Sequence, residues 1–578
     1  SPLLTNFQND IRLNDALFKR IQSVYLNEDR NALTTEQTTL LEKEYKSFVR
    51  NGANLNSESK EKLRIIDTEL SQLSLNFGEH VLADTQAFQL HIEREEDLKG
   101  LPPIVIEMAA EEAQSREKSG WVFTLDYPSY VPFMTYAENR TLRKKLCLAF
   151  GQRGFQDNPQ NNSEIILKIV QLRKKRAQLL GYKSHAAFVL EERMAQSEET
   201  VKKFLDTLSE KAKPAAEKEW ETMKKFAAVN FNLEQLEKWD TAFVSEKLKQ
   251  AELDLDEQQL KPYFPLDKVL EGLFEIVNKL YGIQLKETTQ VESYHPEVKV
   301  FEVHKNNNFH ALLYTDFFPR QGKRNGAWMT SYRSQNKNQR PHVSIVCNFS
   351  KPTQNQPSLL TFQEVTTLFH EFGHALHGIL ANTTYSSLSG TSVFWDFVEL
   401  PSQIMENWCY QPEALTLYAR HFETREVIPK VLIEKIKKAA HFQQGMQTLR
   451  QLSFGYLDLS FHNQKANQIE NIKAHEKNEI SHLQFTQDTP ENCMSTAFSH
   501  IFQGGYAAGY YSYKWAEVLD ADAFELFLEN GIFDPKTATS FLDNILSKGG
   551  TEHPMALYKK FRGKEPDPSA LLRRAGLA

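Results

Sequence analysis

The sequence predicts a mostly α-helical protein of at least two lobes, with a small β-sheet next to a helix that carries a metal-binding motif. Helical periodicity and capping signals recur along most of the chain, whereas β-branched and aromatic residues concentrate between about residues 298 and 349. The length of 578 residues exceeds what one hydrophobic core normally supports. We therefore expect two or more lobes, each with its own core, whether or not they are continuous in sequence.

The N-terminal region, which we place at residues 1–125, is predicted to be helical. Thr34 and Gln37 have the pattern of a capped helix start, and the Asn-Gly pair at residues 51–52 predicts a stop. Another long helix is predicted from Lys60 onward. No internal repeat is evident along the chain.

Residues 126–578 form the second predicted region, which begins with more helices. Residues 151–162, rich in Gly, Pro and Asn, predict a loop or subdomain joint, and Gly282 predicts the end of the helices that follow. Three segments then predict the strands of the small sheet: 298–303, 309–318 and 342–349. An extended peptide can add to the edge of such a sheet as a further strand, and residues 326–329 are our candidate for that edge.

Directly after the sheet, the sequence predicts a helix with two histidines one turn apart. Thr361 begins a capping box, and the helical pattern continues to about Leu380. His370 and His374 lie opposite the apolar stripe, so their imidazoles point away from the core. Side chains four residues apart have Cβ atoms about 5–6 Å apart, so both imidazoles can bind one metal ion. The motif is typical of zinc hydrolases, in which Glu371 would be the general base.

The third metal ligand is predicted to be a glutamate from a second helix. A catalytic zinc ion needs three protein ligands and one open position. His377 shares a helix face with His370, but seven residues correspond to about 10.5 Å of rise, too far for both to bind one ion easily. We therefore expect His377 to line the cavity and assign Glu399 to the metal. Either Glu406 or Asp396 could hold a metal-binding imidazole through its second nitrogen.

A third segment, rich in glycine and tyrosine, offers hydrogen-bond donors for an oxyanion. Tyr506, Tyr510 and Tyr513 have the spacing of one helix face, and the glycine pair at residues 504–505 allows close approach to a ligand. A phenol can donate a hydrogen bond to the charge that develops on a carbonyl oxygen. Aromatic residues at helical spacing more often pack a core, so the functional interpretation depends on the metal motif.

These three segments together resemble the thimet oligopeptidase family of zinc peptidases. The resemblance is carried by residues 370–374 (His-Glu-Phe-Gly-His), 397–403 (Phe-Val-Glu-Leu-Pro-Ser-Gln) and 504–511 (Gly-Gly-Tyr-Ala-Ala-Gly-Tyr-Tyr). It extends over almost the whole chain. The combination of motifs is much more specific than the five-residue zinc pattern alone.

The resemblance implies a zincin-like helical ellipsoid of two lobes, divided by a deep channel with one zinc ion on its floor. Residues 1–125 would form part of a channel wall, and Tyr510 would line the channel. Family members usually carry a further N-terminal helical segment, so we expect part of one wall to be absent from this chain. The implied roles are metal binding by His370, His374 and Glu399, base catalysis by Glu371, and stabilisation of the tetrahedral intermediate by His500, Tyr506 and Tyr513.

Composition excludes several classes of partner. The formal net charge of -7, with 25% charged residues, argues against binding to nucleic acid, which requires a basic face. No apolar run approaches the length of a membrane span, and none near the start resembles a signal peptide. The four cysteines, which are widely spaced, fit reduced thiols in a cytoplasmic protein: Cys147, Cys347, Cys409 and Cys493. We expect a cytoplasmic monomer.

The preferred function is endo-acting hydrolysis of short, unstructured peptides, and two alternatives remain. A dipeptidyl carboxypeptidase of the same family would need a cation to clamp the substrate's terminal carboxylate, for which Arg320, Lys323 and Arg324 are candidates. A non-catalytic peptide-binding protein with structural zinc is a different class. The presence of Glu371 and of only three protein ligands weighs against it, because structural zinc sites usually have four.

Overall fold

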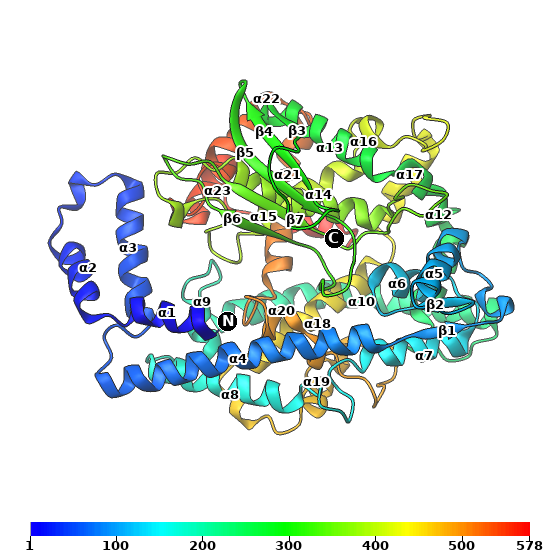
Figure 1. The fold of residues 1–578 in the computed structure, drawn as a ribbon, viewed down its shortest axis with the longest axis horizontal. Coiled ribbons are helices and arrows are strands. Elements are labelled where there is room, and N and C mark those ends of the chain that lie inside the picture. Colours follow the sequence, from blue (N-terminus) through cyan, green and yellow to red (C-terminus); the bar gives the residue numbers. More distant parts are fainter. Residues whose placement is uncertain (1, 578) are drawn as a thin grey trace.

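The computed structural model describes residues 2–577, which form an upper and a lower lobe in the view of Figure 1. One large cavity lies between the lobes. One hydrophobic core contains buried residues between Leu255 and Ile436 and others between Leu519 and Phe561. The opposite lobe combines residues from the N-terminal half with residues from about 449 to 521 and with Ala570 and Leu571 near the C-terminal end. Both lobes are therefore assembled from segments that are distant in sequence. The cavity has a volume of about 1260 Å³ and is lined by both lobes.

The N-terminal helices form a projection at one end of the molecule. They are α1 (Pro2–Arg12), α2 (Asp15–Asn27) and α3 (Thr35–Arg50), and the long helix α4 (Ser57–Ala87) follows them in the chain. The predicted start of α3 is confirmed, because Thr34 and Gln37 form a capping box. Helix α4 runs along the lower lobe in Figure 1 and packs against α8 (Ser163–Leu179). The predicted loop at residues 151–162 lies almost entirely between α7 (Arg140–Gly151) and α8.

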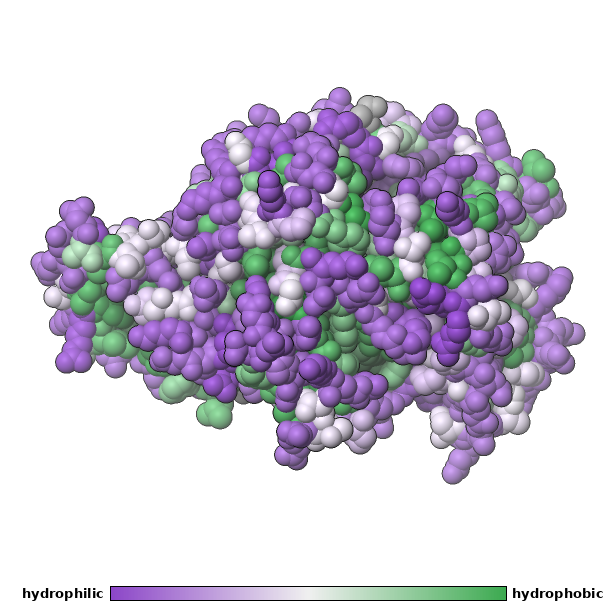
Figure 2. All heavy atoms as spheres, turned by 90° about the horizontal axis from the view of Figure 1, so that it is seen from above, coloured by the Kyte–Doolittle hydropathy of each residue, from purple (hydrophilic) through white to green (hydrophobic). Residues whose placement is uncertain are grey.

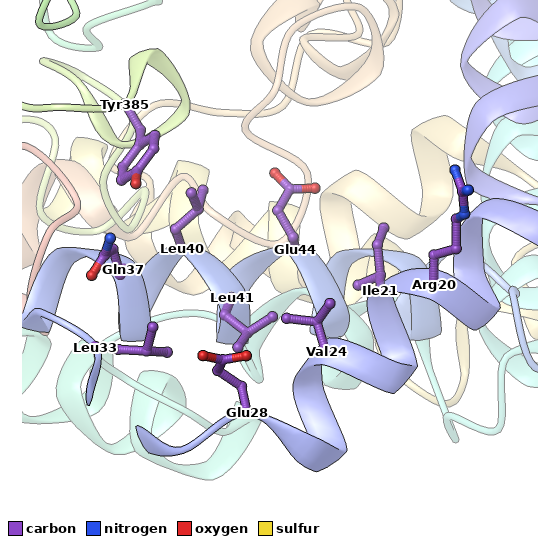
Figure 3. Close-up of a pocket in the computed structure, with 10 residues that line it drawn as sticks. All are labelled: Arg20, Ile21, Val24, Glu28, Leu33, Gln37, Leu40, Leu41, Glu44 and Tyr385. Carbon is purple, nitrogen blue, oxygen red and sulfur yellow. The ribbon is translucent and has the colours of Figure 1, made fainter. Parts of the chain in front are cut away.

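A small apolar hollow lies between α2 and α3, with Tyr385 above it (Figure 3). Its volume is about 410 Å³, and Val24 and Leu41 are among its lining residues. Figure 2 shows apolar side chains at the surface of this end of the molecule. None of the described residues that line this hollow also lines the large cavity, so the two spaces are separate.

Most of the remaining helices before the sheet lie in the lower and right-hand parts of the molecule in Figure 1, whereas the last of them lies near the top. They are α5 (Pro103–Ser115), α6 (Tyr127–Tyr136), α9 (His185–Leu190), α10 (Glu198–Phe231), α11 (Thr241–Leu253), α12 (Glu257–Leu260) and α13 (Leu266–Tyr281). A two-stranded sheet of β1 (Leu90–Ile92) and β2 (Trp121–Phe123) packs beside α5. Gly282 ends α13 with a positive φ of 67°, as the sequence predicts.

The main sheet has five strands in the order β3-β4-β5-β7-β6. Their bounds are β3 (Ile283–Glu287), β4 (Lys299–Lys305), β5 (Asn308–Asp316), β6 (Trp328–Arg333) and β7 (His342–Val346). Strands β5 and β7 are parallel, and the other pairs are antiparallel. The three predicted strands are confirmed as β4, β5 and β7, whereas β3 was not predicted. Strand β6 is an edge strand, and its first residues, Trp328 and Met329, belong to the predicted edge segment and line the cavity.

The C-terminal half supplies the helices around the metal motif. They are α14 (Phe362–Ile379), α15 (Leu400–Glu406), α16 (Pro412–Tyr418), α17 (Lys430–Ala439), α18 (Gln444–His462), α19 (Ile472–Ile480), α20 (Ser499–Phe502), α21 (Ser512–Asn530), α22 (Pro535–Phe541), α23 (Pro554–Arg562) and α24 (Pro568–Arg574). Helix α14 packs on β6 and β7. Gly378 makes this packing close, because a Cβ there would lie 2.9 Å from both Met329 and Val343.

Two further features bear on the sequence predictions. No helix in residues 2–577 has the length and apolar character of a membrane span. All four cysteines are free and buried.

Candidate metal centre

The two histidines of α14 and Glu399 of the next helix converge at the cavity wall. Helix α14 starts with the predicted capping box of Thr361 and Glu364. The Nε2 atoms of His370 and His374 lie 3.2 and 3.0 Å from Oε2 of Glu399. One nitrogen or oxygen atom from each of these three residues lies within 4.8 Å of the others. The structure thus brings together all three residues that the sequence assigns to the metal.

Helices α14 and α15 can pack this closely because residue 373, between the histidines, is glycine. A Cβ at Gly373 would lie only 2.2 Å from the carbonyl oxygen of Pro401 and 2.6 Å from Cα of Ser402. Pro401 is tolerated in the first turn of α15, where its missing N–H has no intrahelical partner. Helix α15 starts at Leu400, so Glu399 is its N-cap residue. A glycine inside an otherwise favourable helix was the signal for this contact, which the sequence analysis missed.

A hydrogen bond and two charges hold the Glu399 carboxylate in place. Ser402 Oγ donates to Oε2 of Glu399 at 2.9 Å, a partner that the sequence did not predict. Burial alone would raise the pKa of Glu399, but the charges and hydrogen bonds of His374 and His370 hold it well below its usual range. Two imidazole nitrogens and an ionised carboxylate are the donors of a typical three-ligand zinc site. The donor set therefore fits a zinc ion with one position left for water or substrate.

Glu406, and not Asp396, contacts an imidazole of the candidate metal cluster. Oε1 of Glu406 lies 2.7 Å from Nδ1 of His370, so the carboxylate accepts from the nitrogen that faces away from Glu399. Asp396 instead accepts from two backbone N–H groups and from the Tyr511 hydroxyl, at 2.7–3.0 Å. The prediction that Asp396 contacts an imidazole is wrong, because its carboxylate binds the backbone of residues 194 and 195 and the Tyr511 hydroxyl instead.

His377 does not line the cavity, so that prediction is wrong. Its side chain is 0% exposed. Neither ring nitrogen has a hydrogen-bond partner among the described residues, and burial lowers the pKa of His377 to about 3, so the imidazole is neutral. The face that His377 shares with His370 is covered at this end of α14, where Gly390 lies against the backbone of residues 377 and 378.

Glu371 is a buried carboxylate at the cavity wall. Its side chain is 5% exposed, and Oε2 has no hydrogen-bond partner among the described residues. Burial raises the pKa of Glu371, against the opposing charges of His370 and His374. A carboxyl group with a raised pKa and an unpaired oxygen suits proton transfer near neutral pH.

The glycine-tyrosine segment, residues 503–511, is not helical, contrary to the interpretation of its spacing. Helix α20 ends at Phe502 and α21 begins at Ser512. The aromatic rings nevertheless meet. Tyr513 stacks on Tyr506 with ring centroids 5.1 Å apart and lies 5.1 Å from Tyr510. The His500 ring lies 5.6 Å from Tyr506, and all four side chains line the cavity.

Two phenols of this group lie beside the three candidate metal ligands. The Tyr506 hydroxyl donates to Oε1 of Glu399 at 2.6 Å. Tyr513 lies near the charges of Glu399 and Glu371, and burial together with these charges raises its pKa well above the usual value. Both phenols therefore stay neutral and can donate hydrogen bonds.

Of the three predicted clamp cations, only Arg324 lines the cavity without forming an ion pair with an acidic side chain among the described residues. Arg320 and Lys323 form ion pairs with buried Asp316 at 2.7 and 2.9 Å. Arg324 lines the cavity, and its guanidinium donates to Oε1 of Gln503 on the opposite wall at 2.9 Å. Arg450 of α18 also lines the cavity, is exposed, and has no ion pair within residues 2–577. Sequence reasoning missed Arg450, because an arginine within a helix carries no local signal.

Glu406→Gln is expected to weaken metal binding by roughly 10–100-fold, the usual effect of losing a partner that orients a metal-binding imidazole. The amide keeps the shape but not the charge that favours the His370 tautomer. Competition with a chelator measures the affinity. Glu413→Gln, an exposed glutamate of α16, is the matched control. Equal affinities in the two variants would contradict the role of Glu406.

Comparison with known proteins identifies the family of this chain and several relatives. The chain matches Peptidase family M3 over residues 133–577. It is 40% identical over 593 residues to oligopeptidase A of Escherichia coli K12, covering 100% of this chain and 86% of that relative. It is 34% identical over 581 residues to the dipeptidyl carboxypeptidase of the same organism, covering 99% of this chain and 85% of the relative.

A solved structure shares the fold. PZ peptidase A with inhibitor 2 is similar to this chain with a TM-score of 0.60, covering 100% of this chain and 84% of its own. The sequence identity is 15%, so this similarity bears on the fold alone. It agrees with a mostly helical protein that has a small mixed sheet.

Proposed function

This chain belongs to peptidase family M3, and from that premise we propose that it is a zinc-dependent oligopeptidase that hydrolyses internal bonds of short, unstructured peptides. The chain is a metallopeptidase. The observation that carries the proposal is the cluster of His370, His374 and Glu399 on the wall of a 1260 Å³ cavity, with the Glu371 carboxylate beside it.

The cavity supports a preference for short peptides. It is lined by residues from both lobes, and its metal-binding residues lie between the lobes and not on an outer surface. An extended peptide spans about 3.3 Å per residue and can thread such a space, whereas a folded domain cannot. Edge strand β6 offers unpaired backbone groups, so a peptide lying along Trp328 and Met329 would gain hydrogen bonds independent of its sequence.

His370, His374 and Glu399 would hold the zinc ion, which would polarise the peptide carbonyl and make an attacking water more acidic. Glu371 accepts the proton of that water. The same carboxyl group then delivers the proton to the leaving amine, so one residue acts as base and later as acid. Its unpaired Oε2 and raised pKa suit both steps.

The aromatic group above the cluster would stabilise the tetrahedral intermediate. Tyr513 and Tyr506 are neutral donors in a largely buried site, where a hydrogen bond to developing charge is strong. Burial also lowers the pKa of His500, so its imidazole is neutral and can donate through one nitrogen. In this structure Tyr506 donates to Glu399, which makes Tyr513 the better placed oxyanion donor. Tyr510 would line the channel beside them.

A blocked peptide offered with a free and with an amidated C-terminus tests the proposal. The chelated protein should be inactive, and added zinc should restore cleavage at internal bonds of both peptides, as read by mass spectrometry of the products. Absence of cleavage by the zinc-loaded protein would contradict the proposed function. Restoration by another divalent metal but not by zinc would contradict the choice of metal.

Dipeptidyl carboxypeptidase activity is the second candidate, because Arg324 places a cation on the cavity wall. Such an enzyme releases C-terminal dipeptides and needs the free carboxylate. Cleavage of the free peptide alone, with dipeptide products, would favour this alternative. A purely structural zinc site is disfavoured by the three-residue donor set and by the unpaired Glu371 oxygen.

We also propose a cytoplasmic enzyme, since four free, buried thiols suit a reducing compartment. Peptides are its proposed partners. The monomeric state and the boundary after residue 125 stay predictions.

A further inference from the structure

A buried aspartate of α18 binds the backbone of the glycine-tyrosine segment. Asp458 is 1% exposed. Its Oδ1 accepts from the N–H of Ala508 at 2.8 Å, and its Oδ2 accepts from the N–H groups of Gly509 at 2.8 Å and Tyr510 at 2.9 Å. Three successive backbone donors therefore converge on one carboxylate. The segment has no helix of its own to satisfy these groups.

The backbone at this point adopts a conformation that needs outside support. Ala508 has a φ of 53°, in the left-handed region that is unfavourable for a residue with a Cβ. Such a conformation persists only when its surroundings hold it in place. Successive N–H groups arranged in this way form a concave site that prefers an anion. The Asp458 carboxylate is that anion.

Two side chains in turn orient Asp458. Nδ1 of His462 lies 2.9 Å from Oδ1 of Asp458, and Nε2 of His462 lies 2.8 Å from Nη1 of Arg173. An arginine can only donate, so Nε2 is the acceptor and Nδ1 carries the hydrogen that bonds to Asp458. The same Arg173 nitrogen donates to the carbonyl oxygen of Ile501 at 2.7 Å, just before the segment. The hydrogen bond from His462 of α18, which is itself hydrogen-bonded to Arg173 of α8, thus fixes the orientation of the Asp458 side chain.

The segment held in this way carries the donors above the metal-binding cluster. Tyr506 and Tyr510 lie within it, and Tyr513 is the second residue of the helix that follows. Glycine lets the segment lie close to its neighbours, because a Cβ at Gly505 would be 2.9 Å from the ring of Trp395. A shift of the backbone at residues 508–510 would therefore move the phenols relative to Glu371 and Glu399.

We propose that Asp458 is a positioning residue of the peptidase: its carboxylate fixes the backbone of residues 508–510 and so places the Tyr506 and Tyr513 hydroxyls for the transition state. This inference rests on the proposed function, because it assumes that those hydroxyls act on a peptide. Asp458 itself touches neither the metal-binding residues nor the cavity in the described structure.

Asp458→Asn tests the proposal. The neutral amide has one acceptor oxygen, so at least one backbone N–H would face an N–H₂ group. Misplacement of reacting groups by about 1 Å costs roughly 10² in rate, so we expect kcat to fall by about that factor with little change in KM or zinc content. Asp522→Asn is the control, since Asp522 is equally buried and accepts from Tyr558 in the upper lobe. A kcat for Asp458→Asn equal to that of Asp522→Asn would overturn the inference.

A double variant separates positioning from general damage. If Asp458 acts through the phenol, Asp458→Asn should lower kcat much less in a Tyr513→Phe background than in the unmutated enzyme. Equal losses in both backgrounds would overturn the inference. Should the unmutated, zinc-loaded enzyme cleave no peptide, the proposed function would fail instead.

Hydrogen exchange on the unmutated protein tests the geometry without a variant. The amide hydrogens of residues 508–510 should exchange as slowly as those of α18, although they lie outside regular secondary structure. Exchange as fast as in exposed loops would show that the carboxylate does not hold them and would overturn the inference.

Discussion

Replacing Glu371 by glutamine is expected to lower peptide turnover by roughly 10²–10⁴-fold, while the zinc content stays near one per chain. The amide has the same shape but cannot accept a proton from the attacking water. Glu371 lies between the two histidines in sequence, its side chain is buried at the cavity wall, and Oε2 has no partner among the described residues. No other carboxyl group of the cluster is unpaired in this way.

Steady-state kinetics with zinc analysis on the same sample measures the effect. The metal analysis is essential, because a variant that loses zinc would also lose activity for a different reason. Near-normal turnover in fully metallated Glu371→Gln would reject the role of base. In that case the neutral imidazole of His500, which also lines the cavity, would have to be re-examined as the proton acceptor.

Replacing Tyr513 by phenylalanine is expected to lower kcat and kcat/KM together by roughly 10²–10³, the typical cost of removing one oxyanion donor. The change deletes a single hydroxyl and keeps the ring that stacks on Tyr506. If the hydroxyl contacts only the transition state, substrate binding should change little and the melting temperature should stay almost the same.

Tyr281→Phe is the matched control, because Tyr281 is buried in the core of the upper lobe and away from the cavity. It should leave kcat unchanged. If Tyr513→Phe behaves like this control, Tyr513 packs the site without acting on the oxyanion. A large fall in melting temperature for Tyr513→Phe would point to a structural role.

Local sequence signals predicted the parts of the fold that depend on neighbouring residues. The capping box at Thr361 and the apolar stripe that follows determine α14 and the face on which its histidines lie. The predicted helix end at Gly282 and the predicted strands rich in β-branched residues are confirmed for the same reason. Strand β3 was missed because its five residues, 283–287, alternate between apolar and polar but include only one β-branched residue and no aromatic residue.

The helical interpretation of Tyr506, Tyr510 and Tyr513 shows how spacing can mislead. The rings meet as predicted, but the chain before α21 forms turns and is not helical. Glycines remove the helix preference locally, and the N–H groups bond to Asp458, which lies about 50 residues earlier in the chain. Nothing in the segment itself reveals that partner.

The sequence alone was enough to predict which side chains come together: two imidazoles and a carboxylate on one helix, and a glutamate at the start of the next. It could not decide between Glu406 and Asp396, or whether His377 faces the cavity. Those outcomes depend on how α14, α15 and the sheet pack, and close packing is a property of whole surfaces. Gly373 brings α15 within contact of α14, which aligns Glu406 with His370, while the cover over the end of α14 buries His377. Side-chain periodicity gives the direction of a residue from its own helix, but only the neighbouring elements decide what it meets there.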